Sequence, residues 1–133
     1  MAHKPRELKL PPRPVPTKSS AKALPFAQWL NALTMARKQA DDPDFDGCEE
    51  MLAYIHVEEV FNHPVKITDL VQCMFFGTGP TVQRKVMTLA NRGFINVSIS
   101  KNDKRAKQLT LTKAGTNLLH ERSKQMAQVL ELS

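Results

Sequence analysis

The sequence has no hydrophobic run that approaches the roughly 20 residues of a membrane-spanning helix. Its first ten residues are charged and lack the apolar stretch of a secretory signal peptide. We therefore expect a cytoplasmic protein that makes no contact with a membrane. The chain has 133 residues, a length that suits a single domain.

Cysteine is scarce, since the chain contains only Cys48 and Cys73, and a disulfide framework is not expected. Both lie in segments with helical hydrophobic periodicity, which predicts buried, reduced thiols. Together with His56 and His63 they match no compact zinc spacing such as Cys-x2-Cys, so we expect neither a metal site nor a cofactor. The chain also lacks a phosphate-binding loop, a nucleophile elbow and a zincin motif, and we expect no enzymatic activity.

Positive charge exceeds negative charge, with a formal net charge of +6 and a pI of about 9.6. Residues 1–22 carry six Lys or Arg against one Glu, and residues 66–124 carry eleven against three acids. Residues 41–59 instead carry eight carboxylates and no Lys or Arg. The basic charge is therefore concentrated at the start and in the second half, a distribution that favours a polyanionic partner.

Residues 1–22 contain five prolines among Lys and Arg, and too few apolar residues to build a core. We expect a disordered basic Pro-rich arm here and a winged-helix domain over 23–133. Two interpretations of the arm stay open. It is either a solubilising tail or a segment that contacts DNA, like the arms that reach into a minor groove.

Helical periodicity begins after the arm. Apolar residues from Phe26 to Ala36 predict a first helix that ends at Asp41-Asp42-Pro43. Asp46, with Glu49 three residues later, has capping-box spacing and predicts a second helix that runs to about Phe61. Residues 66–76 predict a short third helix whose inward-facing residues are Ile67, Leu70, Val71 and Met74.

A turn at Gly77-Thr78-Gly79-Pro80 is predicted to lead into a fourth helix from Pro80 to Arg92, which Gly93 ends. After this helix the hydrophobic period changes from 3.6 to 2. Two segments with the period of 2 flank a charged tip, a pattern that is typical of a β-hairpin. Thr112 is placed to cap a last helix over roughly 113–131. The predicted fold class is mainly α with a small β-hairpin wing, a winged helix-turn-helix.

The fourth helix has an apolar side and a polar side, and it contains no acid. The polar side carries a predicted stripe of Thr81, Arg84, Lys85 and Thr88. Gln83 flanks this stripe and can hydrogen-bond an adenine edge in the major groove. Arg84 can bind a guanine edge there or a phosphate of the DNA backbone. The same pattern also fits an ordinary solvated helix face.

The tip of the predicted wing strengthens the DNA interpretation. It carries Lys101, Lys104, Arg105 and Lys107 against one acid, Asp103. A hairpin of this charge beside a cationic helix predicts binding to double-stranded DNA. Arg105 can enter a minor groove, where negative potential is concentrated, and Asp103 is placed to orient its guanidinium.

Residues 66–119 resemble the MarR family of winged-helix regulators. The matching segments are Ile67-Thr68-Asp69-Leu70, Pro80-Thr81-Val82-Gln83-Arg84, Leu89 to Ile95, Asp103-Lys104-Arg105 and Leu109 to Gly115. The resemblance implies a homodimer joined through terminal helices, with Arg105 in the minor groove and Asp103 bracing it. It also implies repression that a small-molecule effector or cysteine oxidation relieves. The chain departs from the family in having one helix after the wing where the family usually has two.

We therefore expect a sequence-specific, nucleoid-associated transcriptional regulator that binds double-stranded DNA. The apolar stripes of residues 24–40 and 113–131 predict that the terminal helices form the dimer. Two alternatives remain open. One is a winged-helix protein-interaction module in a larger assembly, with the acidic segment 41–59 binding a basic partner. The other is an architectural protein that binds DNA without sequence preference.

Overall fold

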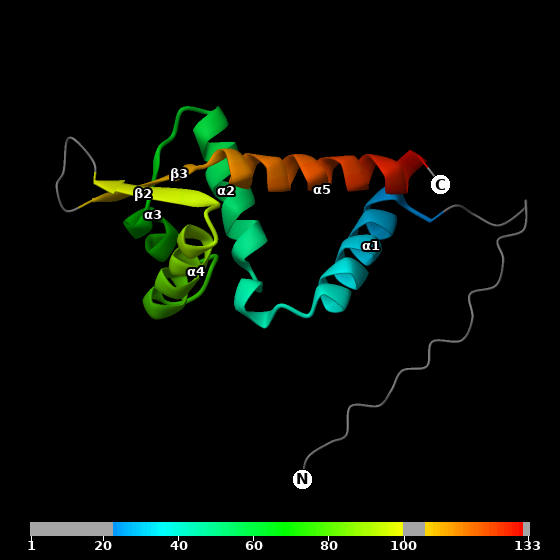
Figure 1. The fold of residues 1–133 in the computed structure, drawn as a ribbon, viewed down its shortest axis with the longest axis horizontal. Coiled ribbons are helices and arrows are strands. Elements are labelled where there is room, and N and C mark those ends of the chain that lie inside the picture. The colour runs from blue at the N-terminus through cyan, green and yellow to red at the C-terminus, as the bar shows by residue number, and fades with distance from the viewer. Residues whose placement is uncertain (1–22, 100–105, 132–133) are drawn as a thin grey trace, which may run out of the picture.

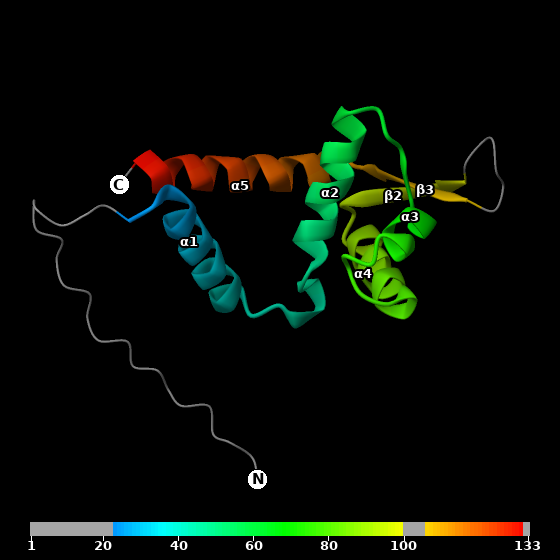
Figure 2. The same cartoon turned by 180° about the vertical axis from the view of Figure 1, so that it is seen from behind.

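The computed structural model describes residues 23–99 and 106–131. The described part is mainly helical, as the sequence predicted, and the predicted hairpin is part of a small three-stranded sheet. A winged lobe is formed by α3, α4 and the sheet, and α2 crosses between this lobe and the terminal helices α1 and α5 (Figure 1). The view from behind shows the same arrangement (Figure 2). The predicted arm at 1–22 lies outside the described residues.

The terminal helices are α1 (Pro25–Ala40) and α5 (Lys113–Glu131), and they contact each other. Pro25 occupies the first turn of α1, where its missing N–H costs nothing, and Asp41 ends the helix in a left-handed conformation. The Thr112 hydroxyl accepts a hydrogen bond from the Gly115 N–H at 3.1 Å. The predicted helix stop at Asp41 and the predicted cap at Thr112 are therefore confirmed.

The central helix α2 (Cys48–Val60) supplies four fully buried core residues, Cys48, Met51, Leu52 and Ile55. The predicted Asp46 cap is wrong, because Gly47 precedes the helix with φ 75° and no side chain caps it. The Lys85 side chain packs so closely on Gly47 that a Cβ there would lie 2.6 Å from its Nζ. Glu49 is not free to complete a capping box, since its carboxylate is paired with arginines.

The helix-turn-helix begins with a strand that the sequence did not predict. β1 (Val65–Lys66) pairs with the second strand of the wing, β3 (Lys107–Leu111). The helix α3 (Ile67–Gln72) follows β1 directly. The helix starts there because the Asp69 carboxylate accepts a hydrogen bond from the Lys66 N–H at 2.9 Å. It ends earlier than predicted, since Met74 adopts a left-handed conformation. Met74 is 80% exposed, so its predicted inward position is wrong.

The wing is formed by β2 (Ile95–Ile99) and β3 (Lys107–Leu111), which pair antiparallel with Ile95 opposite Leu111. β3 is the central strand, with β1 on its other side. Leu109 from β3 and Ile95 from β2 join residues of α2, α3 and α4 in one hydrophobic core. This core fixes the orientation of α4 relative to the wing, and the predicted hairpin is confirmed.

Candidate nucleic-acid interface

The helix α4 (Gly79–Asn91) is the second helix of the helix-turn-helix. Gly77 has φ 107°, a conformation that glycine adopts without strain, and it lies against the Thr81 side chain. Pro80 occupies the first turn of the helix. Val82, Val86 and Leu89 are buried in the core, so the opposite side of α4 faces solvent.

Gln83 and Arg84 are exposed on the solvent side of α4. Arg84 forms no ion pair with any described residue, and no acid lies in the helix. Its guanidinium is therefore available for a bidentate interaction with a base edge or a phosphate. Met87 is 61% exposed on the same side, a position that the predicted polar stripe did not include.

Thr81, Lys85 and Thr88 lie at the flank of this side and are each half-buried. The Thr81 and Thr78 hydroxyls are 3.2 Å apart, and the Thr88 hydroxyl donates to the Arg84 carbonyl at 3.0 Å. The Lys85 ammonium donates to the Phe76 carbonyl at 3.1 Å. Lys85 thus holds the turn before α4 against the protein, a role that its sequence position did not indicate.

The wing contributes Lys107, which is exposed at the start of β3 and pairs in register with Ile99. The other predicted wing residues, Lys101, Asp103, Lys104 and Arg105, lie outside the described residues. Their placement near α4 stays a prediction.

Arg92 follows α4 and connects it to the segment between α1 and α2. Its guanidinium donates to both carboxylate oxygens of Asp42, at 2.5 and 2.9 Å, and lies 4.8 Å from the ring centroid of Phe45. This hydrogen bonding lowers the pKa of Asp42 and raises that of Arg92. The sequence does not predict this clamp, because its local pattern marks Asp42 only as part of a helix stop.

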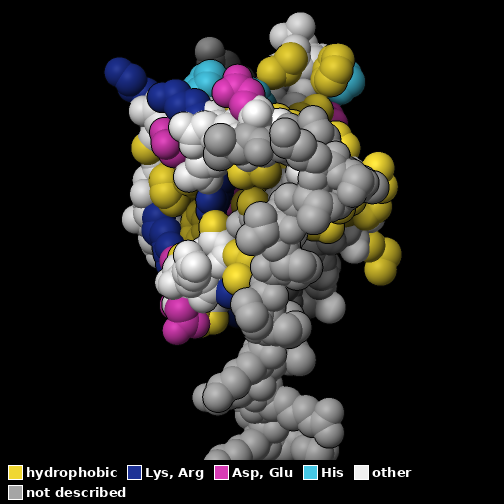
Figure 3. All heavy atoms as spheres, turned by 90° about the vertical axis from the view of Figure 1, so that its right-hand side faces the viewer, with side chains coloured by type: hydrophobic (Ala, Val, Ile, Leu, Met, Phe, Trp, Pro, Cys, Tyr) yellow, Lys and Arg dark blue, Asp and Glu magenta, His cyan; other side chains and the backbone are white. Residues whose placement is uncertain are grey.

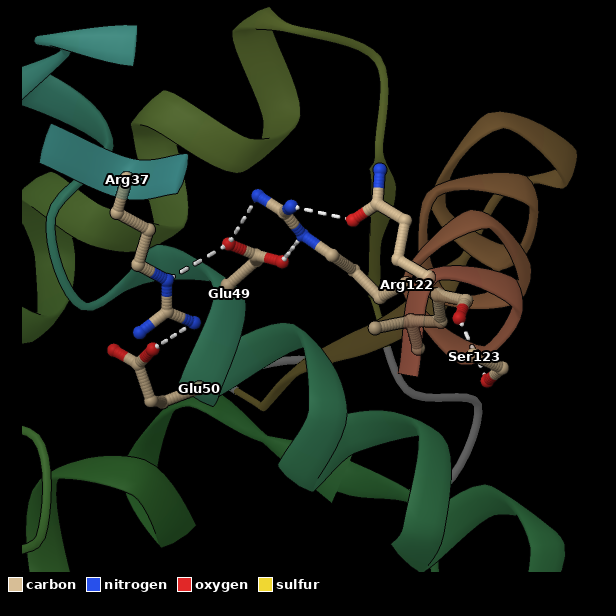
Figure 4. Close-up of polar contacts among 7 residues, drawn as sticks. Arg37, Glu49, Glu50, Arg122 and Ser123 are labelled. Carbon is tan, nitrogen blue, oxygen red and sulfur yellow. Dashed lines mark hydrogen bonds and ion pairs between the residues drawn. The ribbon is translucent and has the colours of Figure 1, made fainter. Parts of the chain in front are cut away.

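Glu49 connects three helices (Figure 4). Its carboxylate accepts hydrogen bonds from Arg37 of α1 at 3.2 Å and from Arg122 of α5 at 2.5 and 3.2 Å. Arg37 also pairs with Glu50 at 2.6 Å. Because Glu49 is only 8% exposed, two arginines compensate the cost of burying its charge.

A cavity of about 720 Å³ lies beside this cluster. Its walls come from α1, the α1–α2 connection, α2, α5 and the end of α4, and they include Arg37, Phe45, Glu49, Arg92 and Arg122. The cavity therefore borders both the Glu49 ion pairs and the Arg92 clamp.

The two cysteines differ in environment. Cys48 is buried and free, and desolvation raises the pKa of its thiol, with Lys85 opposing the shift. Cys73 is half-buried, so the prediction of a fully buried thiol is wrong there. It follows the short helix α3 and donates to the Leu70 carbonyl at 3.3 Å. Over the described ranges, no three His, Cys, Asp or Glu side chains gather as a metal site would require.

Among the described helices, none combines the length and hydrophobicity that crossing a bilayer requires. No family model and no curated protein matches the sequence. Solved structures do share the fold. A mutant of MepR from S. aureus bound to an oligodeoxyribonucleotide has a TM-score of 0.60 at 17% identity, over 83% of this chain and 82% of that chain.

The transcriptional regulator Tm0710 from Thermotoga maritima has a TM-score of 0.58 at 20% identity, over 80% of this chain and 76% of that chain. A mutant of MarR from E. coli has a TM-score of 0.54 at 14% identity, over 84% of this chain and 82% of that chain. The chain therefore has the winged helix-turn-helix fold of MarR-family regulators, in agreement with the resemblance found in its sequence.

Proposed function

We propose that this chain is a transcriptional regulator, not an enzyme, and that it binds specific sequences in double-stranded DNA as a homodimer. The observation that carries the proposal is the solvent side of α4. It presents Gln83 and an unpaired Arg84 on a helix without acids, in the fold of known regulators. A helix of this kind fits the major groove of B-DNA with side chains at base edges.

In this proposal Arg84 binds a guanine edge or a phosphate, and Gln83 binds an adenine edge. Thr81, Lys85 and Thr88 border the groove at the flank of the helix. Lys101, Lys104 and Lys107 neutralise phosphates, while Arg105, oriented by Asp103, enters the minor groove. Residues 1–22 act as a basic arm beside the domain 23–133, and the protein resides on the nucleoid in the cytoplasm.

The dimer is supported by α1, which has 16 residues and none of them buried. Leu24 and Phe26 are 75% and 72% exposed, and Leu30 is 48% exposed. Figure 3 views the end of the molecule where α1 and α5 lie, and hydrophobic side chains are visible on its surface beside the grey residues. A helix with so much exposed apolar surface suits an interface, and a second copy would pair two α4 helices with two half-sites.

The cavity beside Glu49 is where we place a small-molecule effector. Its volume lies within the range of ligand pockets, roughly 300–1,000 Å³. Arg92 lines this cavity, so an occupant that binds better to one position of the end of α4 than to another would change DNA affinity.

The protein-interaction alternative rests on the acidic segment 41–59, and part of its negative charge is paired within the chain. Asp42, Glu49 and Glu50 pair with arginines, and Glu58 lies 3.3 Å from the His63 ring. The Glu59 carboxylate accepts a hydrogen bond from the Leu111 N–H at 2.9 Å, which ties α2 to the wing. Asp41, Asp44 and Asp46 are exposed and form no ion pair with the described residues, so they are the carboxylates that the segment offers to a basic partner.

The test is selection of bound sequences from random duplex DNA with the full chain, followed by affinity measurements over a salt series. We expect an enriched pseudo-palindromic site and an affinity that falls steeply with salt, because phosphate contacts release counterions. Equal affinity for the selected and random duplexes would support the architectural alternative. Absence of DNA binding would leave the protein-interaction module.

A further inference from the structure

Met87 occupies the solvent side of the proposed recognition helix. It follows Gln83 by four residues and Arg84 by three, so the three side chains share one face of α4. Met87 is 61% exposed, whereas its neighbours in the core, Val86 and Leu89, are 3% and 0% exposed. Figures 1 and 2 show that this helix lies at the surface of the winged lobe.

Met87 is not part of the hydrophobic core of the fold. The core beneath α4 is filled by Val82, Val86 and Leu89 together with residues of α2, α3 and the sheet. Met87 is a long apolar side chain in the middle of an otherwise polar face, and it carries no hydrogen-bond donor. Its thioether is flexible and polarisable, so it can adapt to an apolar surface.

In the major groove the only methyl group that unmodified DNA presents is the C5-methyl of thymine, and apolar side chains recognise it by direct contact. We propose that Met87 contacts a thymine methyl group and thereby specifies an A·T pair in each half-site. This inference rests on the proposed function, because it requires α4 to lie in the major groove. It adds an apolar contact to the polar ones assigned to Gln83 and Arg84.

The test uses the site enriched by selection and replaces each thymine in turn with deoxyuridine, which removes only the methyl group. At one thymine per half-site, we expect the wild-type protein to lose about fourfold in affinity per methyl group, from the lost burial of one carbon. The Met87→Ala variant should bind the unmodified site more weakly but should show no further loss at that thymine. Because Met87 is exposed, this variant should keep the thermal stability of the wild type.

Met74→Ala is the matched control. It makes the same chemical change at a methionine that is 80% exposed but lies outside α4, and it should keep the wild-type sensitivity to deoxyuridine. The inference is overturned if wild type and Met87→Ala lose the same affinity at every thymine. If no site is enriched, the proposed function fails first, and this separates the two outcomes.

Discussion

Arg92 and Asp42 form a two-point ion pair although 50 residues separate them, with N–O distances of 2.5 and 2.9 Å. Arg92 ends the proposed recognition helix, and Asp42 lies just after α1. The Arg92 guanidinium lies over the face of the Phe45 ring. The Phe45 and Phe94 rings pack edge to face, with 5.7 Å between their centroids. The position of α4 is therefore coupled to the connection that leads from α1 to α2.

This pair predicts an acid-dependent contribution to stability. The Arg92 guanidinium holds the pKa of Asp42 below its ordinary value of 3.8, so folding favours the ionised carboxylate. Such a contribution is fully present above the unfolded pKa and is lost as pH falls through the lowered folded pKa. We expect Asp42→Asn to lower the Tm by a constant amount from neutral pH down to about pH 5. Below about pH 4 the difference should shrink.

The measurement is thermal unfolding of wild type and variant across this pH range at low salt. Asp46→Asn is the control, since Asp46 is exposed and its side chain makes no ion pair with the described residues. A Tm difference for Asp42→Asn that persists unchanged to pH 2 would contradict the assignment.

Glu49 and Glu50 provide a second, matched pair of variants, because adjacent carboxylates of α2 differ in burial. The Glu49 side chain is 9% exposed and bonded to two arginines, whereas that of Glu50 is 48% exposed and pairs with one. We expect Glu49→Gln to cost about 2–3 kcal/mol of unfolding free energy, since it leaves Arg122 half-buried without its counter-charge. Glu50→Gln should cost less than about 1 kcal/mol. Urea unfolding measures both, and equal costs would show that burial is not the deciding factor.

Local patterns in the sequence were enough to predict most elements. The period of 3.6 located α2 and α4, the period of 2 located β2 and β3, and Thr112 located the start of α5. The two-residue strand β1 is too short to have a period, and it exists because β3 offers a free edge to Val65 and Lys66.

The missed contacts at the site join residues that are far apart in the chain. Lys85 was assigned to the polar stripe of α4, and only the fold shows that the Phe76 carbonyl and Gly47 surround its ammonium. Glu49 and Arg122 are 73 residues apart. Hydrophobic periodicity reports which side of an element is buried, but it carries no information about which distant charge a buried carboxylate meets.

Arg84 and Lys85 are adjacent cations that should respond differently to removal. Arg84→Ala should leave urea unfolding unchanged and weaken DNA binding by about 1–3 kcal/mol, with a smaller salt slope if a phosphate contact is lost. Lys85→Ala should lower the unfolding free energy by about 1–2 kcal/mol, because the Phe76 carbonyl loses its donor. Unfolding curves and binding isotherms of both variants separate the two roles. Equal destabilisation by the two substitutions would contradict the distinction.

Lysine substitutions on the exposed face of α1 test the oligomeric state. In the proposed dimer, Phe26 and Leu30 are one helical turn apart on α1 and become buried against a second copy. Placing lysine at both positions buries two ammonium groups without partners, which an interface does not tolerate.

We expect sedimentation at micromolar concentration to show a species of twice 15.0 kDa for wild type and a monomer for the Phe26→Lys, Leu30→Lys variant. Met74→Lys, which places one lysine at an exposed methionine outside α1, should remain dimeric. Because neither α1 side chain is buried within the protomer, the lysine variant should keep its fold by circular dichroism. A wild-type chain that sediments only at 15.0 kDa would rule out the dimer, and with it the pairing of two α4 helices on a symmetric site.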